Sequence, residues 1–235
     1  YMSVVVEIDF RPLVDCLYNG NDKSTILSMV NESQLKIQEC FLYGEYIYLE
    51  QEERRNFARD SHEYLIDQTQ EMEFSIDQGL NSKNCRLIFN HPVYELIWFY
   101  RSDYHESINR WNYYFHLDDS NNDNQVEPIK DIELLFNGNY RIEKLPSQFF
   151  RLFVPIFSHN SSTSDTIYFY NFGMKLDQLQ PTGACNFSKI DDARMNVYFT
   201  NKGSNGIGRG KLKIIAKSYN ILRIMSGMSG LAHSS

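Results

Sequence analysis

The run Gln180-Pro181-Thr182-Gly183-Ala184-Cys185-Asn186-Phe187-Ser188-Lys189-Ile190-Asp191-Asp192 is the best starting point for understanding this chain. Pro181 fixes its own φ, and Gly183 supplies a backbone position at which φ can be positive, so the first half has the chemistry of a turn. The second half is short, polar and compatible with β structure. It leads into Met195–Phe199, which alternates apolar and polar residues like a half-buried strand. These residues predict a corner between two strands and, by themselves, no chemistry.

Length and composition favour an all-β domain of ordinary size. The 235 residues are 42% hydrophobic, enough for a real core, and a chain of this length can bury about 70% of its unfolded surface. The 23 Lys and Arg residues against 30 Asp and Glu give a net charge of −7, which argues against a coat peptide that neutralises nucleic-acid phosphates. The 16 Tyr and 16 Phe residues suit a β-rich subunit that assembles, because aromatic residues favour both pleated surfaces and protein interfaces.

The cysteines suggest the cellular compartment of the protein, and the first residue suggests that the polypeptide is longer. Cys16, Cys40, Cys85 and Cys185 include no CxxC pair, so we expect reduced, mostly buried thiols in a protein made in the cytoplasm rather than a zinc knuckle. No apolar run approaches the ~18 residues of a membrane span, and no secretory signal is recognisable. The first residue is Tyr1 rather than methionine, so we expect the chain to be a fragment of a longer polypeptide.

One segment carries a helical signal. Three glutamates precede three arginines, in the order Glu50, Glu52, Glu53, Arg54, Arg55 and Arg59. Because a helix favours negative charge at its N-terminus and positive charge toward its C-terminus, this order predicts a short helix near residues 51–60. Beyond Asp60 the pattern changes to period two, which predicts a long strand from Tyr64 to Ile76.

The rest of the chain reads as short strands separated by turns. Pro92 begins a turn that feeds an apolar strand, and Asn137-Gly138 is a strong hairpin signal. Turns or loops are predicted at 19–22, at 118–125 and in the glycine-rich stretch 203–210. Strands are predicted at 4–10, 35–42, 45–49, 96–100, 132–136, 167–172, 212–216 and 219–223. Many short strands at fairly even spacing with one inserted helix predict a sandwich or a jelly roll.

Several patterns begin like metal-binding motifs but lack a required ligand. His62-Glu63 and His105-Glu106 open like the HExxH motif of zinc proteases, but the second histidine would have to stand at Ile66 or Asn109. We therefore expect hydrogen-bonded or exposed histidines. A cupin-like metal site would need clustered histidines, and no His-x-His occurs in the sequence.

Other candidate sites also lack an essential part. The loop around Asp119, Asn121 and Asp123 cannot be an EF-hand, because Asn124 replaces the required glycine and Lys130 the required glutamate. The glycines at 203–210 lack the order of a phosphate-binding loop. Adjacent strand residues point to opposite faces, so Asp191 and Asp192 are poorly suited to act as an acid–base pair. We expect no catalytic, cofactor-binding or metal-binding residues.

Four stretches together resemble one family, the major capsid proteins of the nucleocytoplasmic large DNA viruses. Members typically read Gln-Pro-Ser-Gly, two variable residues and Asn-Phe-Ser-Arg-Ile-Asp, where this chain has Thr182 for the serine and Lys189 for the arginine. Two departures are Tyr94, where members often have lysine, and Ala232-His233, where an aromatic residue usually follows. The resembling stretches are 53–68, 91–98, 180–192 and 219–231.

The resemblance implies a structural protein and no reaction. It implies that residues 1–235 form the second, C-terminal jelly roll of a double-jelly-roll subunit, an eight-stranded β-sandwich with a short inserted helix near residues 51–60, whose upstream jelly roll is not in this chain. Such subunits form homotrimers, pseudo-hexagonal capsomers that build an icosahedral virion shell assembled in the host cytoplasm. The implied partners are neighbouring capsomers and minor capsid and penton proteins, without direct nucleic-acid contact. An inner viral membrane is adjacent and is not spanned.

Two other classes of function remain open on the sequence alone. A carbohydrate-binding jelly roll would stack sugars on exposed aromatic rings such as Trp98, Trp111 and Tyr113. A hydrolase would use an acidic pair such as Asp191 and Asp192, and would lose turnover on Asp191→Asn.

Overall fold

The computed structural model describes residues 5–18, 25, 28, 36–117, 125–161, 165–178, 180–200, 206–226 and 228–233. The chain divides into two compact units. The larger unit contains residues 67–106 and 111–219, and the smaller contains residues 1–66, 107–110 and 220–234.

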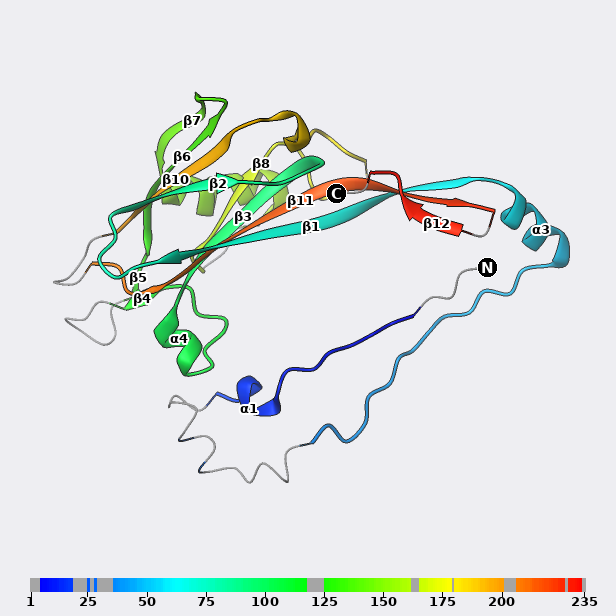
Figure 1. The fold of residues 1–235 in the computed structure, drawn as a ribbon, viewed down its shortest axis with the longest axis horizontal. Coiled ribbons are helices and arrows are strands. Elements are labelled where there is room, and N and C mark those ends of the chain that lie inside the picture. Colours follow the sequence, from blue (N-terminus) through cyan, green and yellow to red (C-terminus); the bar gives the residue numbers. More distant parts are fainter. Residues whose placement is uncertain are drawn as a thin grey trace. The chain divides into compact units, whose positions relative to one another are not determined.

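Two antiparallel sheets carry the fold (Figure 1). The first follows the order β1 (His62–Ile76), β11 (Gly210–Met225), β3 (Pro92–Ser102), β8 (Ile167–Asn171). The second follows the order β2 (Ser82–Leu87), β10 (Ala193–Phe199), β6 (Ile129–Phe136), β7 (Asn139–Pro146). Short strands β9 (Cys185–Asn186) and β12 (Met228–Leu231) pair with β3 and β11, and β4 (His116–Leu117) pairs with β5 (Gln125–Val126).

The strand pairs are nested in the sequence. The β6–β7 hairpin is innermost, β3 pairs with β8 around it, β2 pairs with β10 outside that, and β1 pairs with β11 outermost. Two further pairings, β11 with β3 and β10 with β6, roll the nested hairpins into two sheets. This arrangement is a jelly roll, so the predicted eight-stranded jelly-roll sandwich is confirmed.

The core lies between the inward faces of the two sheets. Trp98 of β3 is fully buried and packs its ring against Phe150 and Tyr168, with centroids 5.4 and 6.1 Å apart. Alternate residues of β10 and β11 are buried, as period two requires. Each fully buried aliphatic side chain contributes about 1.5–3 kcal/mol relative to exposure. The largest other core residues include Tyr100, Ile76, Leu96, Ile129, Ile132, Met195, Ile207, Leu212 and Ile214.

The predicted corner at residues 180–192 is confirmed, and its glycine is needed. Gly183 has φ +149°, and a Cβ added there would lie 2.9 Å from the carbonyl oxygen of Phe172. The Thr182 hydroxyl fixes the preceding loop, donating to the Lys175 carbonyl at 2.7 Å and accepting from its N–H at 3.0 Å. After β9 the chain makes the short 3₁₀ helix η3 (Phe187–Lys189) and enters β10. The helix η3 was not expected from the sequence.

The helix expected near residues 51–60 is α3 (Gln51–Arg59). Its first turn is stabilised by Glu53, whose carboxylate accepts from the backbone N–H of Glu50 at 3.4 Å. Three other predictions are also confirmed. The turn of Asn137 and Gly138 has φ of +50° and +80° and closes the β6–β7 hairpin. The long strand predicted after α3 is β1. The predicted runs 212–216 and 219–223 are both strand and together form β11.

The predicted strands at 4–10, 35–42 and 45–49 are wrong for the residues that the structure describes. Residues 5–10 and 36–50 adopt no strand, and their side chains are exposed. A period-two pattern shows that a segment suits a sheet, but a strand forms only where another strand pairs with its backbone. The predicted turn at 19–22 and most of the loop at 118–125 lie outside the described residues, as do residues 203–205 of the glycine-rich stretch.

Within the described ranges, four helices were missed in addition to η3. They are α1 (Leu13–Cys16), α4 (Asp103–Ser107), the π-helix η2 (Phe149–Phe153) and α5 (Val154–His159). The π turn has a local cause. Pro155 has no N–H to donate and its ring crowds the carbonyl four residues back, and the Val154 N–H bonds to Phe149, five residues back.

Candidate interaction surfaces

The histidines that open zinc-like motifs have structural partners. The His62 ring stacks on Phe57 with centroids 4.3 Å apart, and its Nε2 lies 2.8 Å from the Phe57 carbonyl oxygen. Glu63 accepts from the guanidinium of Arg223 at 2.7 Å. These contacts hold a helix end and a strand in place.

The second pair, His105 and Glu106, also has structural partners. His105 is 1% exposed and packs on the ring of Tyr113, with centroids 4.4 Å apart. Glu106 forms ion pairs with Arg101 at 3.2 Å and Lys211 at 3.7 Å. The proximity of Glu106 raises the pKa of the Lys211 ammonium. Within the described ranges, no group of three His, Cys, Asp or Glu residues could hold a metal ion.

Of the acidic pair Asp191 and Asp192 at the corner, Asp192 makes structural contacts. The Asp192 carboxylate accepts from Arg194 Nε at 2.8 Å, and the Asp192 N–H donates to the side chain of Asn137 at 3.0 Å. Asp191 is exposed. Asp192 therefore connects the corner to the β6–β7 turn, which is a structural role.

A buried charge cluster, which sequence analysis missed, centres on Glu95 of β3. This residue is 0% exposed, and its carboxylate oxygens lie 2.5 Å from His159 Nε2 and 3.2 Å from Lys217 Nζ. Lys217 and Asn171 are its direct neighbours on β11 and β8, and the Asn171 amide, turned with its nitrogen toward Glu95, donates to it at 3.2 Å. The one available signal was a single acid inside the apolar run 93–100. The cluster neutralises a buried carboxylate and fixes α5 against the sheet.

Burial also raises the pKa values of a cysteine and two tyrosines in the core. Desolvation raises the pKa of the Cys85 thiol to about 12, so this cysteine stays protonated at neutral pH and is no nucleophile. Desolvation raises the pKa values of the Tyr100 and Tyr168 phenols as well, with nearby Glu127 adding to the shift at Tyr168. These groups therefore stay neutral in the core.

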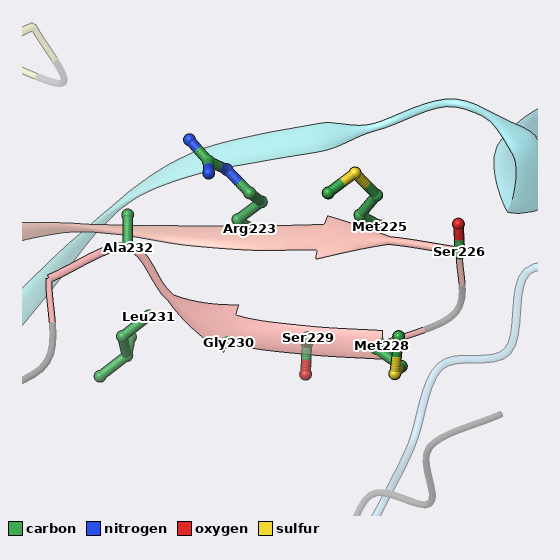
Figure 2. Close-up of a pocket in the computed structure, with 8 residues that line it drawn as sticks. All are labelled: Arg223, Met225, Ser226, Met228, Ser229, Gly230, Leu231 and Ala232. Atoms are coloured by element: carbon green, nitrogen blue, oxygen red, sulfur yellow. The ribbon is translucent and has the colours of Figure 1, made fainter.

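An open hollow of about 460 Å³ lies beside the β11–β12 hairpin (Figure 2). Figure 2 shows Arg223 and Met225 on β11, and Met228 and Leu231 on β12. The Arg223 guanidinium is held by Glu63, so the hollow offers mainly apolar contacts. Met225, Met228 and Leu231 are 51%, 69% and 44% exposed. Such a surface suits contact with another protein surface better than chemistry.

Trp98 and Tyr113 are 0% and 8% exposed, so these two rings cannot stack on a sugar. Trp111 lies under the Arg101 guanidinium, 5.7 Å from its ring. No helix in the described part of the chain is both long enough and apolar enough to cross a membrane.

The jelly-roll sandwich, its structurally engaged polar groups and its exposed apolar surfaces suit protein–protein contact better than chemistry. Residues 53–230 match the family described as large eukaryotic DNA virus major capsid protein. The chain belongs to this family.

Comparisons with individual relatives support the family assignment. The chain is 32% identical over 229 residues to the major capsid protein of Pyramimonas orientalis virus, covering 88% of this chain and 52% of the relative. It is 26% identical to that of Phaeocystis pouchetii virus, covering 100% of this chain and 61% of the relative. Among solved structures it resembles the quasi-atomic model of the PBCV-1 virus capsid, at a TM-score of 0.69 and 28% identity, over 81% of this chain and 56% of that one. The chain thus spans about half to three-fifths of the length of these proteins.

Proposed function

We propose that this chain is a shell-forming part of the capsid of a large DNA virus, acting as a structural protein and not as an enzyme. The observation that carries the proposal is the family match over residues 53–230 on a jelly roll similar to the PBCV-1 capsid. The subunit forms a homotrimer, a pseudo-hexagonal capsomer of an icosahedral shell assembled in the host cytoplasm. Its partners are neighbouring capsomers and minor capsid and penton proteins. It contacts no nucleic acid and spans no membrane, although an inner viral membrane is adjacent.

The proposed subunit contains a second jelly roll upstream, as the shares of 52% and 61% of the relatives' length allow. The C-terminal roll of this proposal comprises residues 1–235, and the family match covers residues 53–230 of it. The described residues 5–10 and 36–50 alternate like strands, yet they are exposed and unpaired in this chain. In the complete polypeptide they would pair with the upstream roll, which provides the neighbours that they lack here.

The test is the mass of the oligomer that the complete polypeptide forms in solution. Light scattering should give three chains, because an obligate interface of roughly 2,000–5,000 Å² does not dissociate at micromolar concentration. Electron microscopy of particles from infected cells should place the subunit in the shell. A stable monomer would contradict the proposal. Specific binding on a glycan array by such a monomer would favour the carbohydrate-binding alternative.

A further inference from the structure

The β6–β7 hairpin (Figure 1) ends in a two-residue turn formed by Asn137 and Gly138. The strand register pairs Phe136 with Asn139, so the two turn residues lie outside the ladder, and both are exposed. A Cβ added at Gly138 would meet nothing within 4 Å, so the space beside this residue is open. Water therefore has access to the Asn-Gly pair.

An asparagine followed by glycine can deamidate without an enzyme. The backbone nitrogen of Gly138 attacks the side-chain carbonyl carbon, Cγ, of Asn137 and loses its proton. A new C–N bond forms, the C–N bond of the side-chain amide breaks, and the amide nitrogen takes up a proton and leaves as ammonia. Water then opens the resulting succinimide ring to aspartate or isoaspartate. The net reaction consumes one water and releases one ammonia, and glycine favours it because no side chain crowds the attacking nitrogen.

The conformation of the turn opposes this reaction. The φ values of +50° at Asn137 and +80° at Gly138 are those of a type I′ hairpin turn, whose first central residue has ψ near about +30°. With this ψ, the nitrogen of Gly138 points away from the side chain of Asn137 across the Cα–C bond. The ring can therefore close only after Asn137 rotates out of the turn conformation.

Two hydrogen bonds to Asp192 hold Asn137 in the turn. The Asn137 N–H donates to the Asp192 carbonyl at 2.7 Å, and the Asp192 N–H donates to Asn137 Oδ1 at 3.0 Å. Asp192 is held in turn by Arg194, whose Nε donates to its carboxylate at 2.8 Å. Because Asp192 is the last residue of the corner 180–192, rotation of Asn137 requires this end of the corner to release it.

We propose that Asn137 is a modification site for spontaneous deamidation, which the corner at 180–192 keeps closed. While Asp192 holds the turn, the side-chain amide persists; when the corner opens locally, the ring closes and the amide is lost. Isoaspartate carries the main chain through its side-chain methylene, so the two-residue turn gains a backbone atom and no longer matches the ladder. The modification therefore marks chains whose corner has opened. It concerns this chain alone and does not rest on the proposed function.

The experiment follows loss of the Asn137 amide while the complete polypeptide is incubated in mildly alkaline buffer, either folded or in urea. Peptide mass spectrometry after acidic digestion assigns the site, because Asn19-Gly20 and Asn205-Gly206 share the dipeptide. Protein isoaspartyl methyltransferase identifies the isoaspartate product. The folded wild type should lose the amide at least about tenfold more slowly than the unfolded chain, since reaction needs an opening that costs about 1.4 kcal/mol or more.

Two variants loosen the corner without changing the turn. Gly183→Val introduces a Cβ close to the Phe172 carbonyl oxygen, and Thr182→Val removes both hydrogen bonds to the Lys175 backbone. The matched control is Leu212→Ala, which opens a cavity at a fully buried position of β11. The variants are compared at urea concentrations that give each the same small unfolded fraction, so that global unfolding contributes equally.

Both corner variants should lose the Asn137 amide severalfold faster than Leu212→Ala under these conditions. If Gly183→Val does not fold, the milder Thr182→Val carries the comparison. Equal rates in the corner variants and the control would mean that Asn137 reacts only through global unfolding, and would overturn the role of the corner. Equal rates in folded and unfolded wild type would show that the turn gives no protection. An unfolded chain that retains the amide would show that Asn137 is not a modification site.

Discussion

At Gly183 the backbone permits no side chain. Its φ of +149° is rarely adopted by L-residues, and an added Cβ would lie 2.9 Å from the Phe172 carbonyl oxygen. We expect Gly183→Val to lower the free energy of unfolding by about 1–3 kcal/mol in urea denaturation. Gly230→Ala is the matched control, because a Cβ there meets nothing within 4 Å, and it should be nearly neutral. Equal losses for the two variants would show that the corner is not the constraint inferred here.

Cys85 makes stability depend on alkaline pH. The pKa of its thiol is about 12 in the folded chain against an ordinary 9.0, so the unfolded state loses its proton first as the pH rises. Stability from this group is complete below pH 9.0 and falls between pH 9.0 and about 12, by about 1.4 kcal/mol per pH unit. Urea denaturation at about pH 8 and about pH 10.5 should therefore show a smaller loss in Cys85→Ala than in wild type. Cys40→Ala, at an exposed thiol, should keep the wild-type slope.

Among the elements, β11 carries two lysines in very different surroundings. Lys217 lies 3.2 Å from the fully buried Glu95, whereas Lys213 lies 2.7 Å from Glu71, whose side chain is 63% exposed. Removing one partner of a buried pair leaves an uncompensated charge, so Lys217→Met should destabilise the fold by about 2–3 kcal/mol. Lys213→Met should cost less than about 1 kcal/mol. Thermal or urea unfolding compares them, and a larger loss at Lys213 would refute the assigned role of Glu95.

The elements that the sequence predicted well have a strong period and a clear end. Strand β10 alternates, strand β6 stops at the turn of Asn137 and Gly138, and the acidic start and basic end of α3 mark its direction. The segment 149–159 was missed because other apolar residues, such as Phe150 and Leu152, obscure the helical spacing that begins at Phe149. The Glu95 cluster was missed because its partners come from distant strands and a helix, and only tertiary structure brings them together. Residues 5–10 and 36–50 were misplaced because alternation does not identify the partner strand.

At the scale of the whole molecule, the proposed upstream roll predicts a pattern of proteolysis. In residues 1–235 alone, the exposed stretch 36–50 contains Phe41, Tyr43, Tyr46 and Tyr48, so chymotrypsin should cut there first. The core at 67–219 should resist, because its strands are paired and its apolar side chains are buried. In the complete polypeptide the same stretch should be protected by its sheet.

Fragment mapping by mass spectrometry reads both cases. Rapid cutting within 36–50 in the complete polypeptide would argue against its place in an upstream roll, even if the trimer forms.

The nesting of strand pairs has a consequence for synthesis on the ribosome. Strand β11 lies between β1 and β3, so the first sheet stays incomplete until residues 210–225 leave the exit tunnel. Until then β1 and β3 each present an open edge, and such edges can pair with the nascent chains of neighbouring ribosomes. Closing pairs so far apart in the sequence is also slow. We therefore expect the yield of correctly folded chains to rise when chaperones are supplied or when translation is slowed after β10.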